Sequence, residues 1–205
     1  MYIPKHYEEQ EWNEIEQLIR EFGFALLVNI NNNVPIATHL PLELAQNETG
    51  EWILLGHVSK ANPQWKSFEA DKDVLAVFTG PHAYVSPTWY NHKNVPTWNY
   101  RAVHVYGKVR ILAGEEIIAG LRNMMARYEH LHAKQPMKME DLPQQLLQKD
   151  LNGLVAFEIK IERFEAAGKL SQNRDAESYQ SVIEHLKRSD AYHSKRIAEE
   201  MVKRK

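Results

Sequence analysis

Residues 24–44 read FALLVNINNNVPIATHLPLEL. An apolar run from Phe24 to Ile30 is followed by three asparagines, and a second, mostly apolar run extends from Val34 to Leu44. Asparagine tolerates the left-handed backbone that tight hairpin turns require. Short apolar runs bounded by turn residues are typical of strands. This stretch therefore predicts two antiparallel strands joined by a turn at residues 31–33.

The remainder of the chain continues this pattern. A third strand is expected at 52–58 after a turn at 47–50, which indicates an antiparallel meander. Further strands are expected at 74–79, 100–112 and 153–164. Gly80-Pro81 should break the first of these, and 82–86 could continue it. The side chains of 100–112 alternate between two faces, with Arg101, Val103 and Val105 on the same one. Helices are expected at 8–21, 61–70, 114–133, 141–151 and 175–203. The last helix is polar enough to lie on a surface. About six antiparallel strands with inserted helices favour a closed or half-closed barrel, because closure removes exposed sheet edges.

Composition excludes several classes of protein. The 205 residues are 43% hydrophobic and 25% charged, as in ordinary globular proteins. Cysteine is absent, which excludes disulfides, thiolate catalysis and cysteine-ligated metals. The formal net charge is −2, so no overall basic field attracts DNA or an anionic membrane. No apolar signal-peptide core opens the chain, and runs such as Phe24–Val28 are too short to span a bilayer. We expect a soluble, cytoplasmic protein.

The stretch GHVSKANPQW, residues 56–65, lies where a predicted strand ends and a predicted helix begins. Such a junction offers unpaired backbone N–H groups and the positive end of a helix. Ser59 adds a hydroxyl, Lys60 adds a cation, and Asn62 is a candidate helix cap. These groups could hold a phosphate monoester. Taken alone, the stretch favours the alternative interpretation, a capped helix whose lysine is simply solvated, because strand-to-helix caps with a nearby lysine are common.

The stretch ATHLP, residues 37–41, brings polar side chains into an apolar strand. A planar heteroaromatic ligand needs a few donors and acceptors set in an apolar wall. Thr38, His39 and His57 could supply them. Satisfied or exposed histidines are the alternative interpretation.

Two later stretches are also candidates. Aromatic residues and prolines crowd GPHAYVSPTWY and VPTWNY, within residues 80–100, where they could cover a flat ligand or a partner subunit. A self-packed loop would use the same residues. KLSQNR, residues 169–174, joins two cations to three hydrogen-bonding side chains and could close over an anion. It also fits a polar linker.

Other sites are not predicted. His130 and His132 would point about 200° apart on a helix, which is wrong for one metal ion. No HExxH, Walker, GxGxxG or GxSxG motif occurs, so no set of catalytic residues is assigned. The basic residues near the C-terminus fit a solvated helix end better than a DNA-reading helix.

Five stretches in this order resemble the PaiB-type family of FMN-binding negative transcriptional regulators. They are ATHLP, GHVSKANPQW, GPHAYVSPTWY, VPTWNYRAVHVYG and KLSQNR. The resemblance runs from MYIPKHY at the start to about Leu186. Lys60 stands where many relatives carry arginine, which keeps the charge but loses the bidentate fork.

The resemblance implies a split β-barrel like that of pyridoxamine phosphate oxidases, over residues 1–170, with a C-terminal helical extension over 171–205. It also implies a homodimer with FMN at the subunit interface. By similarity of layout, the residues beside the flavin ring or ribityl chain are Thr38, His39, Gly56 and His57. Those near the phosphate are Ser59, Lys60 and Asn62. Those contributed by the other subunit are Trp98, Asn99, Ser171, Gln172, Asn173 and Arg174.

Two functions follow from this resemblance. The first is an FMN-binding regulator that represses protease production and sporulation genes, with DNA as a partner that only the resemblance implies. The alternative is a flavin-dependent oxidoreductase acting on a small substrate, with Trp89 and Trp98 walling a cavity over the ring. Haem binding is a third hypothesis, since related split barrels include haem proteins.

Overall fold

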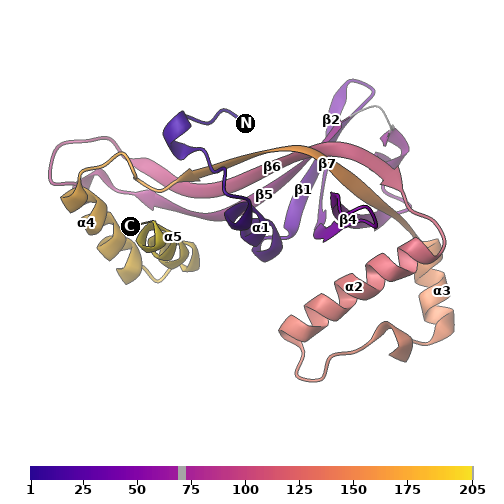
Figure 1. Ribbon diagram of the computed structural model, residues 1–205. Helices are drawn as coiled ribbons and strands as arrows, with labels where there is room; N and C mark the ends of the chain where they lie inside the picture. The colour runs from indigo at the N-terminus through magenta and orange to yellow at the C-terminus, as the bar shows by residue number, and fades with distance from the viewer. Residues whose placement is uncertain (69–72, 205) are drawn as a thin grey trace. The chain divides into compact units, whose positions relative to one another are not determined.

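The computed structural model describes residues 1–68 and 73–204 (Figure 1). These residues divide into two compact units. One, which we call the barrel unit, comprises 23–77 and 105–163, apart from 69–72. The other, which we call the terminal unit, comprises 1–22, 78–104 and 164–204. Three long strands contribute residues to both units.

The described residues form a seven-stranded sheet. Its strands are β1 (Phe24–Asn31), β2 (Val34–Pro41), β3 (Glu43–Gln46), β4 (Trp52–Ser59), β5 (Asp73–Val85), β6 (Thr97–Ile111) and β7 (Leu154–Lys169). Their order is β2-β1-β5-β6-β7-β4-β3. Strands β2 and β3 lie at opposite ends of this order, yet only Leu42 separates them in the chain. The two sheet edges must therefore approach each other, so the sheet curls into the expected barrel.

The β1–β2 hairpin is confirmed. Asn32 and Asn33 have φ values of 49° and 61°, in the left-handed region that the turn requires. The register pairs Leu27 with Thr38 and Leu26 with His39. Because side chains alternate along a strand, Thr38 and His39 point to opposite faces of the sheet.

The expected meander is wrong. The predicted second strand ends at Pro41, and the backbone N–H of Leu42 donates to the carbonyl of Gly23 at 2.8 Å. Strand β3 then pairs with β4, and β4 pairs on its other side with β7. The residues that pair between β4 and β7 are 95 to 107 positions apart, and such distant pairing leaves no local pattern in the sequence, which explains the error.

Strand β5 is also longer than expected. Gly80-Pro81 was expected to break it, but it continues to Val85. A Cβ on Gly80 would lie 3.0 Å from the carbonyl oxygen of Arg101, so this glycine allows close approach of backbone. The alternation predicted for β6 is confirmed, with Arg101 on the buried side.

The described residues contain five α-helices and four short 3₁₀ helices. The α-helices are α1 (Trp12–Glu21), α2 (Glu115–His132), α3 (Gln144–Asn152), α4 (Ala176–Arg188) and α5 (Tyr192–Lys203). The 3₁₀ helices are η1 (Lys5–Tyr7), η2 (Pro63–Ser67), η3 (Pro87–Trp89) and η4 (Met139–Asp141). The helix expected at 61–70 is η2, and positions 69 and 70 lie outside the described residues.

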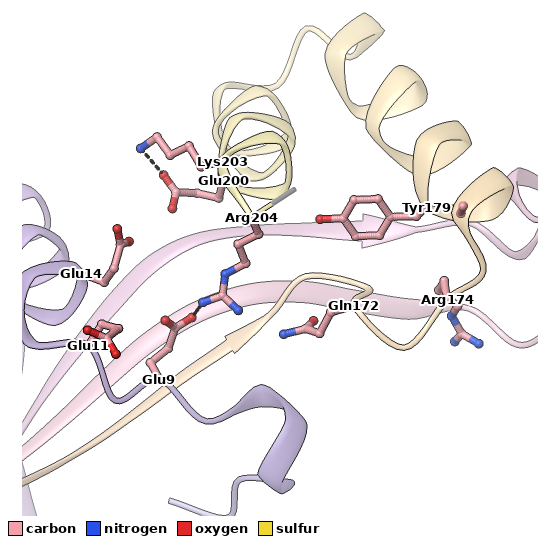
Figure 2. Close-up of a pocket in the computed structure, with 10 residues that line it drawn as sticks. Glu9, Glu11, Glu14, Gln172, Arg174, Tyr179, Glu200, Lys203 and Arg204 are labelled. Atoms are coloured by element: carbon pink, nitrogen blue, oxygen red, sulfur yellow. Dashed lines mark hydrogen bonds and ion pairs between the residues drawn. The ribbon is translucent and has the colours of Figure 1, made fainter.

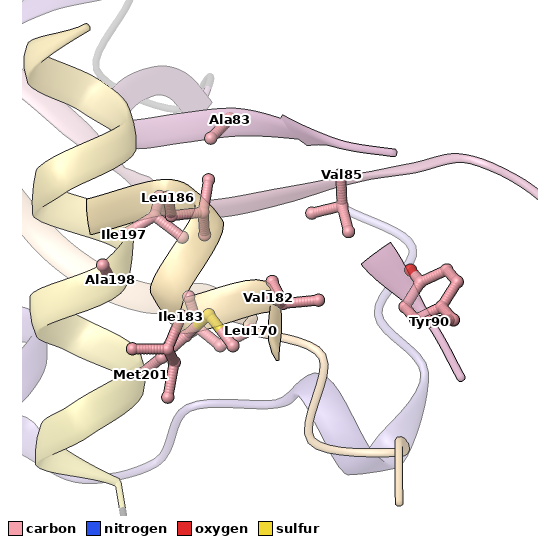
Figure 3. Close-up of a cluster of buried hydrophobic side chains, with 10 residues drawn as sticks. All are labelled: Ala83, Val85, Tyr90, Leu170, Val182, Ile183, Leu186, Ile197, Ala198 and Met201. Atoms are coloured by element: carbon pink, nitrogen blue, oxygen red, sulfur yellow. The ribbon is translucent and has the colours of Figure 1, made fainter. Parts of the chain in front are cut away.

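The C-terminal segment differs from the single surface helix expected at 175–203. It forms α4 and α5, which lie side by side (Figure 1). Their inner faces are buried against Leu170 and residues of the β5 end, as Figure 3 shows. The residues that the two helices contribute are Val182, Ile183, Leu186, Ile197, Ala198 and Met201. The expected domain boundary at residue 170 stays a prediction.

No helix within 1–68 and 73–204 combines the length and apolar character needed to cross a membrane.

Candidate functional site

Asn62 connects the end of β4 to β2 within the barrel unit. It caps η2, because its Oδ1 accepts a hydrogen bond from the backbone N–H of Gln64 at 2.9 Å. Its Nδ2 donates to Oγ1 of Thr38, also at 2.9 Å. The structure therefore brings together two predicted site residues from separate motifs.

Ser59 and Lys60 lie exposed where β4 ends. The Ser59 hydroxyl accepts from the backbone N–H of Ala61 at 3.3 Å. The Lys60 backbone is fixed at both ends: its N–H donates to Gly153 at 2.8 Å, and its carbonyl accepts from the Trp65 indole at 3.0 Å. Within 1–68 and 73–204, no carboxylate pairs with the Lys60 ammonium. Among the described residues, this end of β4 thus presents a cation without a carboxylate partner on a fixed backbone.

The two predicted histidines have different surroundings. His39 is exposed on β2 and stacks on Phe24, with ring centroids 6.2 Å apart. His57 is half-buried on β4, and its Nδ1 has no hydrogen-bond partner among the described residues. Burial lowers the pKa of His57, so its imidazole is neutral at pH 7. A buried ring nitrogen without a partner is costly unless something else binds it.

Gly56 is explained by packing. A Cβ at this position would lie 2.6 Å from Cδ2 of Leu42 and 3.0 Å from Cζ of Phe157. Both neighbours are core residues of the barrel unit, and only glycine fits between them. A side chain at position 56 would therefore point into the core.

An exposed apolar face surrounds His39. Directly paired residues of neighbouring strands share a face, and the pairs Phe24–Pro41 and Leu26–His39 lie on this one. Phe24 is 68% exposed. The same face includes the pairs Val28–Ala37 and Ile30–Pro35, and Val77 and Leu75 on β5. We call it the β1–β2 face.

The six remaining predicted residues belong to the terminal unit. Trp98 is 54% exposed and lies 5.9 Å from the ring of Tyr84 and 6.2 Å from that of His82. Asn99 is fully buried, and its Oδ1 accepts from the Ser171 hydroxyl at 3.0 Å. Asn99 and Ser171, predicted from separate motifs, are thus in contact.

Residues 171–174 form a turn held by its own side chains. Gln172 accepts from the Leu170 N–H and donates to the Gly168 carbonyl, both at 2.6 Å. The Arg174 N–H donates to the Ser171 carbonyl at 3.0 Å. Asn173 is exposed. These contacts leave the Arg174 guanidinium 4.8 Å from the centroid of the Tyr90 ring.

Sequence reasoning missed a buried ion cluster in the terminal unit. Arg101 on β6 donates to Glu200 on α5 at 2.5 Å and lies 3.9 Å from Glu9. All three side chains are more than nine-tenths buried. Glu9 also pairs with Arg204, and Glu200 with Lys203. The sequence signal that could have indicated this cluster is Arg101, a charged residue on the buried side of the alternating strand β6.

A pocket of about 630 Å³ opens beside this cluster (Figure 2). Its lining comes from the N-terminal segment with the start of α1, the turn between β7 and α4, the start of α4 and the end of α5. The lining residues are Glu9, Glu11, Glu14, Gln172, Arg174, Ala176, Tyr179, Glu200, Lys203 and Arg204. Two predicted flavin residues, Gln172 and Arg174, therefore face this pocket. Within 1–68 and 73–204, no group of three or more metal-ligating side chains is present.

A family model described as "Putative FMN-binding domain" matches residues 1–163. The chain belongs to this FMN-binding family. The sequence resemblance is thereby confirmed, and FMN is the cofactor of the family. The protein named "Protease synthase and sporulation protein PAI 2" of Bacillus subtilis is 43% identical over 98% of this chain and 96% of its own length. A protein from Emericella nidulans is 28% identical over 89% of both chains.

Solved structures show the same fold. An FAD- and haem-binding protein from Mycobacterium smegmatis matches with a TM-score of 0.61, covering 85% of this chain and 79% of that one at 13% identity. The flavocytochrome Anf3 from Azotobacter vinelandii matches with a TM-score of 0.59 at 15% identity. The match covers 87% of this chain and 78% of Anf3. This FMN-binding family member is thus a split barrel of the expected type.

The residues at the end of β4 fit FMN in their chemistry. A phosphate needs a cation and hydrogen-bond donors, and Lys60, Ser59 and the nearby Asn62 provide them. An isoalloxazine ring needs an apolar surface with a few polar groups. The β1–β2 face is apolar, and the exposed imidazole of His39 on that face is a polar group of the required kind.

Proposed function

We propose that this chain is an FMN-binding negative regulator of protease production and sporulation genes. The observation that carries the proposal is 43% identity, over nearly the full length, to a Bacillus subtilis protein named for protease synthesis and sporulation. The match to the FMN-binding family over 1–163 supports the cofactor. We place the protein in the cytoplasm, where such a regulator would meet DNA or a partner protein.

The FMN phosphate is placed at the end of β4. Ser59 and Lys60 bind it there, and Asn62 holds the η2 end in position. The exposure of both side chains and the absence of a carboxylate on Lys60 within the described chain support this placement. A lysine contacts phosphate as a point charge and not as a bidentate fork.

The flavin ring is placed against the β1–β2 face. His39 lies on that face and would orient the ring. Thr38 and His57 would contact the ribityl chain, and the Gly56 backbone would lie beside it. Asn62 fixes the Thr38 side chain, which supports a preorganised site. When bound, FMN supplies a ring that accepts one or two electrons. The neutral His57 imidazole can then donate or accept one hydrogen bond at Nδ1, depending on its tautomer.

A homodimer is the proposed assembly. A contiguous apolar face on a soluble protein usually marks an interaction site, and Phe24 and Ile30 on the β1–β2 face are 68% and 48% exposed. A second copy that covers this face would shield the flavin from water. Trp98, Gln172 and Asn173 of the second copy would complete the site, and the buried Asn99 and Ser171 would hold them in position. DNA binding and the oxidoreductase alternative stay predictions.

The cofactor placement is tested by comparing FMN with riboflavin, which lacks the phosphate. Lys60→Ala should weaken FMN about tenfold, equivalent to about 1.4 kcal/mol, and leave riboflavin affinity unchanged. Lys149→Ala, on the exposed side of α3, is the matched control. Affinities are measured by flavin fluorescence. Equal loss for both ligands would place the phosphate elsewhere.

The regulatory role is tested in a strain that lacks the gene. Transcripts of extracellular protease and sporulation genes should rise and should return to their normal level with the wild-type gene. A variant that no longer binds FMN should fail to restore repression if the flavin is required. Unchanged transcripts in the deletion strain would contradict the proposal.

A further inference from the structure

Lys169 and Arg174 are two cations that have no carboxylate partner in the part of the chain that the structure describes. The Lys169 ammonium donates to Oγ1 of Thr97 at 2.5 Å and lies 5.7 Å from the centroid of the Tyr7 ring. The Arg174 guanidinium lies over the Tyr90 ring. Neither cation pairs with Asp or Glu within residues 1–68 and 73–204. Both are half-buried in the terminal unit.

The carboxylates closest to the two cations in the sequence are already used, and Glu165 pairs with the N-terminal ammonium. Asp175 caps α4 by accepting from the Ser178 N–H at 2.9 Å, and its other oxygen lies 3.8 Å from His92. Burial lowers the pKa of the Lys169 ammonium, and the positive charge of Arg174 lowers it further. The two cations therefore repel each other in a partly desolvated place, which is unfavourable unless an anion joins them.

Unused donors lie in the same cluster. Nε of Arg174 is buried and has no partner among the described residues. Tyr90 is more than nine-tenths buried, and its hydroxyl likewise has no partner within the described chain. Buried polar groups nearly always find hydrogen bonds in native proteins. Two orphaned donors beside two unpaired cations point to a bound oxyanion.

The backbone holds this arrangement under strain. Ser171 has a φ of 62°, a left-handed conformation that costs a non-glycine residue energy. Its hydroxyl is tied to the buried Asn99, and both ends of the Gln172 amide are bonded to backbone. The turn that results brings Arg174 back toward the end of β7, where Lys169 lies. A costly turn fixed by side chains is typical of a ligand-binding position.

We propose that Lys169 and Arg174 bind the phosphate group of a small ligand, at a site distinct from the flavin phosphate site proposed at Lys60. A phosphate monoester carries nearly two negative charges at neutral pH and so compensates both cations, whereas a carboxylate would compensate one. Arg174 and Gln172 line the pocket of about 630 Å³, which leaves room for the body of the ligand. In Figure 2, Arg174 lies on the side of this pocket away from Glu9 and Glu11, where repulsion of an anion is weakest.

The test uses inorganic phosphate and FMN-saturated protein. Thermal unfolding is followed as phosphate replaces chloride at constant ionic strength. The wild-type melting temperature should rise to a plateau. Arg174→Gln and Lys169→Met should weaken apparent phosphate affinity at least tenfold, and Arg174→Lys, which keeps the charge, should weaken it less. Lys60→Ala should respond as the wild type does, because its phosphate site is the flavin's.

Two results would overturn the proposal. One is a phosphate response in Arg174→Gln equal to that of the wild type. The other is a wild-type response that FMN saturation abolishes, together with an Arg174→Gln variant that loses affinity for FMN but not for riboflavin. In that case the pair holds the flavin phosphate itself.

The proposed flavin placement is judged separately. If Lys60→Ala leaves FMN affinity intact, that placement fails, while the phosphate response of the wild type still decides the second site. Lys169→Met removes a cation–cation repulsion, so it should fold and melt close to the wild type without phosphate. Should it not fold, the comparison of Arg174→Lys with Arg174→Gln carries the test.

Discussion

Asn62 and Thr38 are joined by a hydrogen bond of 2.9 Å across 24 residues of sequence. Asn62 uses its two side-chain atoms for different purposes, since Oδ1 caps η2 and Nδ2 holds Thr38 on β2. One amide therefore fixes both the strand-to-helix junction and the hydroxyl proposed to meet the flavin. The same bond is open to a direct thermodynamic test.

Thr38→Val should remove only the bond to Asn62 and cost about 0.5–1.5 kcal/mol of unfolding free energy. Asn62→Asp should cost a similar amount, because it keeps the capping oxygen and loses the donor. Asn62→Ala loses both and should cost about 1–3 kcal/mol. Urea unfolding measures each. If Thr38→Val and Asn62→Ala are fully additive in the double variant, the bond contributes nothing.

Arg101→Met should be strongly destabilising, by about 3 kcal/mol or more, because it leaves the buried carboxylates of Glu200 and Glu9 short of a counter-charge. Arg20→Met is the matched control. Arg20 pairs with Glu16 at 2.8 Å on the exposed side of α1, and such helix pairs contribute about 0.5 kcal/mol or less. The loss of unfolding free energy, measured by denaturant unfolding, should therefore be several times larger for Arg101→Met than for Arg20→Met. Similar losses would mean that the buried cluster adds no more than a surface pair.

Stability should fall as the pH drops below the ordinary histidine range, in part because of His57. Burial lowers its pKa in the folded protein, so the unfolded chain binds the proton first, near pH 6.5. Above that pH both states are neutral and the effect disappears. His57→Gln should flatten the dependence of unfolding free energy on pH between 7 and 5, and His130→Gln, an exposed histidine on α2, should not. Unfolding at several pH values decides this, and parallel curves for wild type and His57→Gln would contradict it.

Two glycines should respond in opposite directions to alanine. A Cβ on Gly107 of β6 would collide with the backbone of Lys160 on β7 and approach Cγ2 of Ile159 to 3.0 Å. Gly107→Ala should therefore lower the unfolding free energy several times more than an ordinary surface substitution does. Gly120 lies within α2, and a Cβ there would meet nothing within 4 Å. Gly120→Ala should raise stability by about 0.5–1 kcal/mol through helix propensity.

Local elements could be predicted because local rules decide them. The Asn32–Asn33 turn, helix α2 and the alternation of β6 each depend on residues a few positions apart, and all three are confirmed. The expected meander is wrong because β4 pairs with β7, whose residues lie 95 to 107 positions away in the chain. Helices α4 and α5 are charged on their outer faces, so the composition of 175–203 indicated a surface helix. Their contact with each other buries Ile183 and Ile197, and the composition does not reveal this contact.

The candidate site divides in the same way. The motifs predicted Thr38, Asn62, Asn99 and Ser171 as site residues. No spacing in the sequence, however, predicts that Thr38 bonds to Asn62 or that Asn99 bonds to Ser171. Contact between Gly56 and the flavin stays a prediction, and the structure adds that the position of Gly56 between Leu42 and Phe157 is a packing requirement of the barrel core. The burial of Glu9 and Glu200 was not predicted, because a glutamate near either end of a chain is usually solvated.

The amino-acid sequence by itself determined the strands, the turns, the family and the set of residues on which chemistry depends, since these follow from side-chain type and short-range spacing. Only the tertiary structure decided which strands meet, which charges are buried and which cations lack a partner. Those outcomes depend on contacts between segments far apart in the chain, and the free energy of a buried charge is set by its neighbours in space.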